Sequence, residues 1–104
     1  MKIDELIAKE YLTRIPIDKK LILKELGEAE YDLDKANVAL EQKDFKWAII
    51  KAYYSMFHAA RALLFSLGLK ERRHFAVSMA LEQLNEDGKL ESKHVNDFRA
   101  AMSS

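Results

Sequence analysis

The chain has 104 residues, a formal net charge of zero and no cysteine. That length provides one hydrophobic core, so we expect a single domain over residues 1–104, with a core at about 18–103 and a short helix within 1–16. The absence of cysteine excludes disulfides and thiolate metal sites, and it favours a reducing, cytoplasmic location. No apolar run approaches the roughly 18 residues that would span a membrane, and the first residues do not resemble a signal peptide.

The charge is distributed unevenly along the chain. Residues 1–43 carry 8 Lys/Arg and 10 Asp/Glu, residues 44–80 carry 6 and 2, and residues 81–104 carry 3 and 5. The middle third is therefore basic, by a net +4. A field of this size suits a nucleotide or a short RNA better than a long DNA duplex.

The first periodic segment predicts a short amphipathic helix over about residues 3–13. Its apolar positions are Ile3, Leu6, Ile7 and Tyr11. Pro16 ends this segment, because the residue before a proline is driven out of the helical region. Asp18 then provides a cap for the next helix.

Residues 18–42 form the clearest helical pattern. Apolar residues step by four and three along it, at Ile22, Leu26, Ala29, Leu33, Ala36 and Leu40. This spacing predicts a seam that faces one partner helix. The charged residues of the other face, Lys24, Glu25, Glu28, Asp32 and Lys35, are interpreted as solvated. The short turn at 41–44 predicts an antiparallel helical hairpin.

Residues 44–68 predict the central helix, with Asp44 as its N-cap and Gly68 just past its end. Its apolar side chains cover more than half of its circumference, which is too much for a helix with one neighbour. The remaining arc consists of small residues: Ala48, Ala52, Ser55, Ala59, Ala62 and Ser66. Small residues in a row allow another helix to approach closely.

A narrow polar stripe runs along this helix at Lys51, Tyr54, His58 and Arg61. One interpretation is that Lys51 and Arg61 extend from a half-buried helix into water while His58 caps a neighbour. A second is an anion or RNA site, with the two cations on phosphate and His58 as acid or base. A third is a structural ion pair with acidic residues of a neighbouring helix.

The chain after residue 68 predicts two further helices, over about 73–86 and 90–103, separated by a stop signal at 85–88. Arg72, Arg73 and His74 precede the first of them. One interpretation is that His74 caps or packs against a helix. The other is that the three residues form a phosphate-facing cluster at the start of a helix. Tyr53 and Tyr54 are interpreted as core or interface aromatics rather than base-stacking platforms. The fold class is all-α, an antiparallel up-and-down bundle of four to five helices. We predict no cofactor and, because the three histidines are dispersed, no metal site.

The central run WAIIKAYYSMFHAARALL, residues 47–64, resembles the signature of prokaryotic HEPN-domain proteins of the small stand-alone branch. Gly68, His74 with Val77, and Gly88–Lys89 extend the resemblance, which covers about residues 20–100. It implies an antiparallel helical bundle, commonly a homodimer, that associates with nucleotides or RNA. Many such proteins are metal-independent ribonucleases, often toxins neutralised by a partner minimal nucleotidyltransferase. Their Arg and His form an R-x4–6-H motif at the dimer interface.

The chain departs from that motif, since no arginine within the 104 residues has a histidine at the required spacing downstream. The function we predict is therefore a dimeric HEPN-like module that binds a nucleotide, RNA or a partner nucleotidyltransferase without the standard nuclease motif. One alternative is an active ribonuclease toxin that uses His58 with Arg61, or Arg61 with His74 across a dimer. Another is a TPR-like interaction module, suggested by residues 44–48, although no 34-residue repeat is present.

Overall fold

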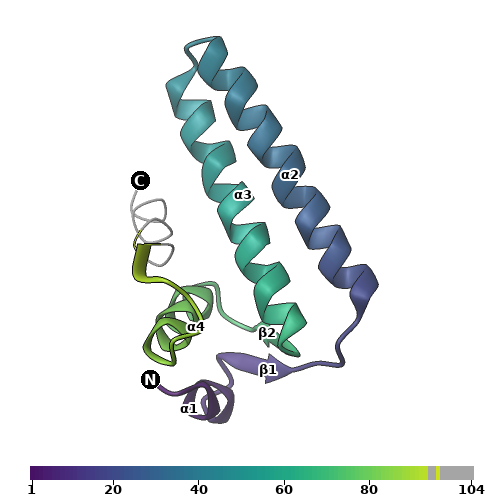
Figure 1. Cartoon of the computed structure of the whole chain (residues 1–104), viewed down its shortest axis with the longest axis vertical. Helices are drawn as coiled ribbons and strands as arrows, with labels where there is room; N and C mark the ends of the chain where they lie inside the picture. Colours follow the sequence, from purple (N-terminus) through teal and green to yellow (C-terminus); the bar gives the residue numbers. More distant parts are fainter. Residues whose placement is uncertain (94–95, 97–104) are drawn as a thin grey trace.

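Two long antiparallel helices dominate the computed structural model, which describes residues 1–93 and 96 (Figure 1). The elements are α1 (Ile3–Ala8), β1 (Leu12–Arg14), α2 (Lys19–Glu41), α3 (Phe45–Ser66), β2 (Leu69–Glu71) and α4 (Phe75–Glu86). The predicted helical bundle is confirmed, with four helices and a small pair of strands in this part of the chain. Most of the helix predicted over 90–103 falls outside the described residues.

The first predicted helix is too long, because α1 ends at Ala8 instead of continuing to residue 13. Glu10 takes a left-handed conformation with φ of 62°. This conformation lets the Tyr11 N–H donate to the carbonyl of Leu6 and the Glu10 N–H donate to that of Ile7, a common way of closing a helix end. The chain then enters β1, which pairs antiparallel with β2 so that Leu12 is opposite Glu71. Glutamate is not a typical residue for this conformation, so the sequence carries no signal for the early stop.

The ends of the two long helices agree with the sequence predictions. The Asp18 carboxylate accepts a hydrogen bond from the Lys20 N–H at 2.9 Å, and the Asp44 carboxylate accepts one from the Trp47 N–H at 3.3 Å. Gly68 follows α3 with φ of +72°. The short turn between the helices folds α2 back along α3 as a helical hairpin (Figure 1).

The contact between α2 and α3 differs from the predicted leucine seam. The buried residues of α2 are Glu25, Ala29, Asp32, Ala36 and Ala39, and they face a row that includes Ala48 and Ala62 on α3. The Ser55 hydroxyl donates to the Ala29 carbonyl at 2.7 Å, so the two backbones lie close together. Large side chains do not fit between backbones this close. Leu26, Leu33 and Leu40 therefore stand at the edge of the contact, each about half exposed.

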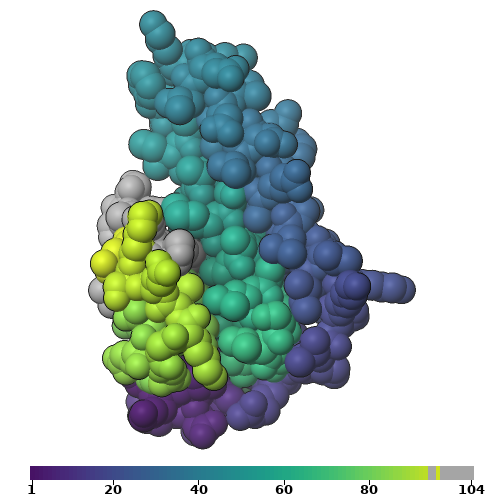
Figure 2. Space-filling view, viewed as in Figure 1, coloured from purple at the N-terminus to yellow at the C-terminus, as the bar shows by residue number. Residues whose placement is uncertain are grey.

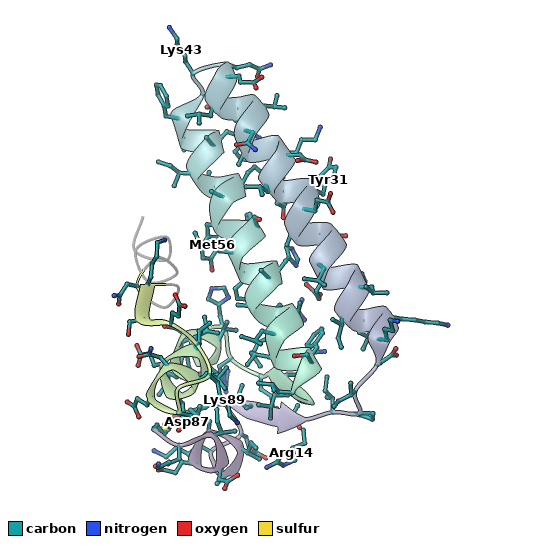
Figure 3. The ribbon with its side chains drawn as sticks, viewed as in Figure 1. Arg14, Tyr31, Lys43, Met56, Asp87 and Lys89 are labelled. Atoms are coloured by element: carbon teal, nitrogen blue, oxygen red, sulfur yellow. The ribbon has the colours of Figure 1, made fainter. Side chains whose placement is uncertain are left out.

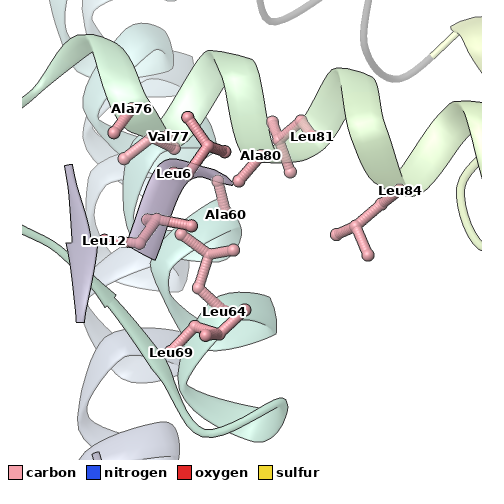
Figure 4. Close-up of a cluster of buried hydrophobic side chains, with 10 residues drawn as sticks. All are labelled: Leu6, Leu12, Ala60, Leu64, Leu69, Ala76, Val77, Ala80, Leu81 and Leu84. Carbon is pink, nitrogen blue, oxygen red and sulfur yellow. The ribbon is translucent and has the colours of Figure 1, made fainter. Parts of the chain in front are cut away.

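A hydrophobic core occupies one end of the molecule, where α1, both strands and α4 surround the second half of α3 (Figures 1 and 4). Its buried residues are Leu6, Leu12, Ala60, Leu64, Leu69, Ala76, Val77, Ala80, Leu81 and Leu84. Met56 packs against this core from the side of α3 away from α2, whereas Tyr31 points outward from α2 (Figure 3).

The other end of the hairpin projects beyond the rest of the described chain, as Figure 2 shows. Several large apolar side chains of this projecting half are exposed, among them Leu40, Phe45, Trp47 and Ile49. Among the described residues, neighbours thus cover the wide apolar arc of the central helix mainly along its second half.

Candidate functional site

Six charged or ionisable side chains meet between α2, α3 and β2. We call them the carboxylate cluster: Glu25, Asp32, Lys51, His58, Arg61 and Glu71. Glu25 and Asp32 are each only 6% exposed. The interpretation of these two residues as part of a solvated face is therefore wrong. Their seven-residue spacing places them on the same side of α2 as Ala29 and Ala36, and this side packs against α3.

Glu25 is the centre of the cluster. One carboxylate oxygen lies 2.5 Å from His58 Nδ1, and the other accepts a hydrogen bond from Arg61 Nη1 at 2.9 Å. An ionised carboxylate can only accept, so the imidazole proton must be on Nδ1 when the carboxylate is charged. Glu25 thus fixes the tautomer and the orientation of His58 and holds one edge of the Arg61 guanidinium.

Asp32 makes longer contacts about two helical turns further along α2. Its two carboxylate oxygens lie 3.6 Å from Lys51 Nζ and 3.7 Å from His58 Nε2. Lys51 Nζ also lies 5.5 Å from the centre of the Trp47 ring, a cation–π contact at the edge of the cluster. His58 is therefore placed between two acidic side chains, with Glu25 at one ring nitrogen and Asp32 near the other.

Glu71 closes the cluster from the strand pair. It accepts a hydrogen bond from Arg61 Nε at 2.8 Å, while the guanidinium lies over the Phe65 ring at 5.1 Å. The pairing of β2 with β1 holds Glu71 in this position. Its other carboxylate oxygen is buried without a hydrogen-bond partner among the described residues. Arg61 thus joins α2, α3 and β2 through two carboxylates.

The polar stripe predicted on the central helix divides into two parts. Lys51, His58 and Arg61 face acidic neighbours, which matches the third interpretation left open by the sequence. Tyr54 lies outside the cluster and is about half exposed, with its ring 5.4 Å from that of Tyr53. A phosphate-binding role for these four residues remains a prediction.

A second group surrounds His74 at the start of α4. The Tyr53 hydroxyl shares a hydrogen bond with His74 Nε2, and the Phe57 ring stacks on the imidazole with centroids 4.6 Å apart. His74 occupies the N-cap position of α4 but makes no capping hydrogen bond through its side chain. Burial, and secondly the charge of Tyr54, raises the pKa of Tyr53 above its ordinary value, so its hydroxyl stays protonated at neutral pH.

Arg72 and Arg73 precede His74 and are both exposed. Arg72 reaches Glu10 only at 3.9 Å, and both side chains of that pair are mostly in water. Arg73 makes no ion pair with any residue in the described part of the chain. We call Arg72, Arg73 and His74, with Tyr53 and Phe57 behind them, the basic aromatic patch. It combines exposed positive charge with ring surface.

Sequence reasoning found the cations of the carboxylate cluster and missed its acids. A signal was nevertheless present. Asp32 and Lys51, like Glu25 and His58, are equally distant in sequence from the Glu41–Gln42 bond. In an antiparallel hairpin that turns at this point, such residues lie at the same level, so opposite charges there predict ion pairs.

Neither a metal-ligand group nor a membrane-crossing helix is found in the described part of the chain. Among residues 1–93 and 96, no three His, Cys, Asp or Glu side chains are grouped so that they could hold a metal ion. In the same residues, no helix has the length and apolar character needed to cross a membrane.

Comparison with known proteins identifies relatives. Over 48 residues the chain is 46% identical to a protein of the UPF0332 group from Pyrococcus horikoshii. This match covers 46% of this chain and 34% of the relative. Over 49 residues it is 39% identical to a Methanocaldococcus jannaschii protein named "Putative toxin", covering 47% and 37%. These matches span only about a third of each relative. No solved structure matches. The HEPN domain model matches residues 24–103, most of the chain, and this range includes all six residues of the carboxylate cluster and the whole basic aromatic patch. This chain belongs to the HEPN family.

Proposed function

We propose that this chain is a HEPN module of a toxin–antitoxin-type system that binds single-stranded RNA or a nucleotide through the basic aromatic patch, without the standard nuclease motif. The observation that carries this proposal is the difference between its two groups of cations. Lys51 and Arg61 face carboxylates, whereas Arg72 and Arg73 are exposed to water and directly precede His74, whose ring stacks on that of Phe57. Exposed cations next to aromatic faces are the elements with which proteins bind single strands.

Each part of the patch has a defined role in this proposal. Arg72 and Arg73 contact phosphates, and the imidazole of His74, held by Tyr53, provides a further polar contact. The stacked pair of His74 and Phe57 offers a flat surface against which a base can lie. Affinity should fall steeply with salt, because each phosphate contact releases bound counterions.

Fluorescence anisotropy with a labelled single-stranded RNA tests this proposal. We expect the double variant Arg72→Ala/Arg73→Ala to bind at least about tenfold more weakly and to show a smaller salt slope. The matched control is Lys35→Ala/Lys46→Ala, which removes two exposed cations from the α2–α3 hairpin. Equal affinities of the two double variants would refute the assignment of the patch.

The alternative function, a metal-independent ribonuclease, has its own test. End-labelled single-stranded RNA is incubated with the protein in EDTA, with Arg61→Ala and His74→Ala in parallel. Cleavage that disappears in a variant which remains folded would establish a nuclease with an unusual arrangement of residues. Intact RNA would support the binding role.

The partner proposals rest on family membership and on the exposed apolar surface. We propose a homodimer formed through the projecting half of the hairpin, where Phe45, Trp47 and Ile49 of α3 are exposed. Light scattering should give twice the monomer mass, and Trp47→Glu/Ile49→Glu should return the monomer. A monomeric wild-type protein would refute this. The relative whose name describes a toxin supports an antitoxin partner, and the family resemblance implies that this partner is a minimal nucleotidyltransferase; co-expression followed by gel filtration would test this.

A further inference from the structure

Three leucines of α2 stand beside the helix contact and are each about half exposed. We call them the leucine row: Leu26, Leu33 and Leu40. Each directly follows a residue that is buried against α3, and one residue turns a helix by about 100°, so the row lies at one edge of the contact. Lys24 directly precedes the buried Glu25, and it lines a hollow together with Arg61. The leucine row is therefore at the opposite edge from the carboxylate cluster.

Acidic side chains border the leucine row on the side of α2 that is turned away from α3: Glu30, Asp34 and Glu41. Two of them directly follow a leucine of the row, and the third follows one by about one helical turn. All three are exposed, and no ion pair joins them to another residue in the described part of the chain. The exposed Lys24 and Lys35 directly precede buried residues, so they lie at the other edge of α2. The border of the leucine row is thus negative.

We propose that the leucine row binds an amphipathic helix of a partner protein, with basic residues beside its apolar face. The row runs from residue 26 to residue 40, about 21 Å along the helix axis, which matches about four turns of a bound helix. Leucines seven residues apart lie on one side of a helix, which is the spacing that a second helix needs to pack its own apolar residues between them. Lysines or arginines of the partner would then lie next to Glu30, Asp34 and Glu41.

The charge of the border disfavours a second copy of this chain as the occupant. Two leucine rows placed face to face would bring the acids of one copy close to the acids of the other, and like charges oppose association. The homodimer proposed above uses the projecting half of the hairpin and needs neither Leu26 nor Leu33. The basic aromatic patch lies outside α2 and is not part of this surface either. The proposal is therefore independent of both the RNA site and the dimer.

Fluorescence anisotropy with two labelled synthetic peptides tests the charge of the partner. Both are helices of about 18 residues with leucine at heptad positions a and d, and they carry either lysine or glutamate at positions e and g. We expect saturable binding of the lysine peptide to the full chain, at least about tenfold tighter than that of the glutamate peptide and weaker at high salt. Failure of the lysine peptide to bind, or equal affinity of the two peptides, would overturn the proposal.

Variants of the apolar residues then locate the surface. We expect Leu26→Gln/Leu33→Gln to bind the lysine peptide at least about tenfold more weakly, because it removes two apolar contacts of the interface without opening the core. The matched control is Tyr31→Gln/Val38→Gln, which changes two exposed apolar residues on another side of α2 and should bind like the wild type. Unchanged affinity in the leucine variant, or an equal loss in the control, would overturn the assignment.

Two further measurements separate the border from self-association. Glu30→Gln/Asp34→Asn should reduce the preference for the lysine peptide over the glutamate peptide, and an unchanged preference would contradict the role of the acids. Light scattering of Leu26→Gln/Leu33→Gln should give the same mass as the wild type. A dimeric wild type that becomes monomeric in this variant would show that a second copy covers the leucine row, and it would overturn the proposal.

Discussion

Removing the Glu25 carboxylate should destabilise the fold far more than removing a surface charge. Its two oxygens contact His58 Nδ1 at 2.5 Å and Arg61 Nη1 at 2.9 Å, and the residue is 6% exposed. In Glu25→Ala, both partners would lose a nearby acceptor inside a helix contact. Breaking a buried ion pair by deleting one partner costs about 3–5 kcal/mol.

Two features of the site lower that figure. The side chains of Arg61 and His58 are 21% and 23% exposed, so water can solvate part of the charge left behind. Arg61 also keeps its bond to Glu71. We therefore expect a loss of about 3 kcal/mol for Glu25→Ala, near the lower end of that range. Glu25→Gln should lose about half as much, because its amide oxygen can still accept one hydrogen bond while the charge is gone.

Urea unfolding followed by far-UV circular dichroism provides the measurement. With a slope of about 1–2 kcal/mol per molar urea, a loss of 3 kcal/mol lowers the midpoint by about 2 M. Protein concentration must be the same for all variants, since dimerisation would add to the apparent stability. The control is Glu28→Gln, an exposed carboxylate on the same helix, which should stay within about 0.5 kcal/mol of the wild type. If both Glu25 variants behave like this control, the carboxylate cluster contributes nothing measurable to stability.

Three further predictions concern the backbone, the core and a tyrosine. Gly68→Ala should destabilise the fold by about 1–2 kcal/mol, because φ is +72° and the new methyl group would lie 3.2 Å from the Ile15 carbonyl. Gly27→Ala lies within α2 with no atom within 4 Å of the new methyl group, and it should stabilise the fold by up to about 1 kcal/mol. Urea midpoints of the two variants that fail to move in opposite directions would contradict this. Leu6→Ala should cost about 2–4 kcal/mol because Leu6 is fully buried in the core, whereas Ile17→Ala, at 65% exposure, should cost little; similar thermal midpoints for the two would contradict the placement of α1. Tyr53 should ionise later than the other tyrosines in an absorbance titration at 295 nm, and this late component should vanish in Tyr53→Phe. Because its pKa is raised in the folded state, the stability it contributes is present below pH 10.0 and is lost as pH rises above that value; a single titration step near the ordinary value would contradict this.

The sequence predicts the long helices and their ends well because these depend on local chemistry. Asp18, Asp44 and Gly68 act at the positions where the residue type alone places them. The strand pair could not be predicted in the same way. Three residues of β1 pair with three of β2, more than fifty positions away, and the early turn that permits this depends on a left-handed glutamate.

Only the cations of the carboxylate cluster were predicted from the sequence, for a related reason. Helical periodicity gives the residues that share a face, but it does not give the direction from which the next helix approaches. The leucines at positions 26, 33 and 40 predicted that α3 would lie against them. The small residues of both helices instead bring the two backbones close together. The side of α2 that faces α3 therefore carries Glu25 and Asp32, which are buried, and the leucines lie at the edge of the contact. The acids were then available to pair with cations already identified on α3.

The double role of Arg61 determines how any loss of activity in its variants must be interpreted. The guanidinium joins Glu25 to Glu71 and also lines a hollow between the start of α2 and the end of α3, so Arg61→Ala would remove a structural bridge and the predicted phosphate contact together. Arg61→Lys separates the two effects only partly, because one ammonium cannot reproduce the planar fork that reaches two carboxylates. Glu71→Gln removes the charge of the bridge on one side, and Glu71 is not part of the lining of the hollow. A ligand-binding loss in Arg61→Ala that Glu71→Gln does not share, measured at equal folded fraction, would assign the effect to contact with the ligand.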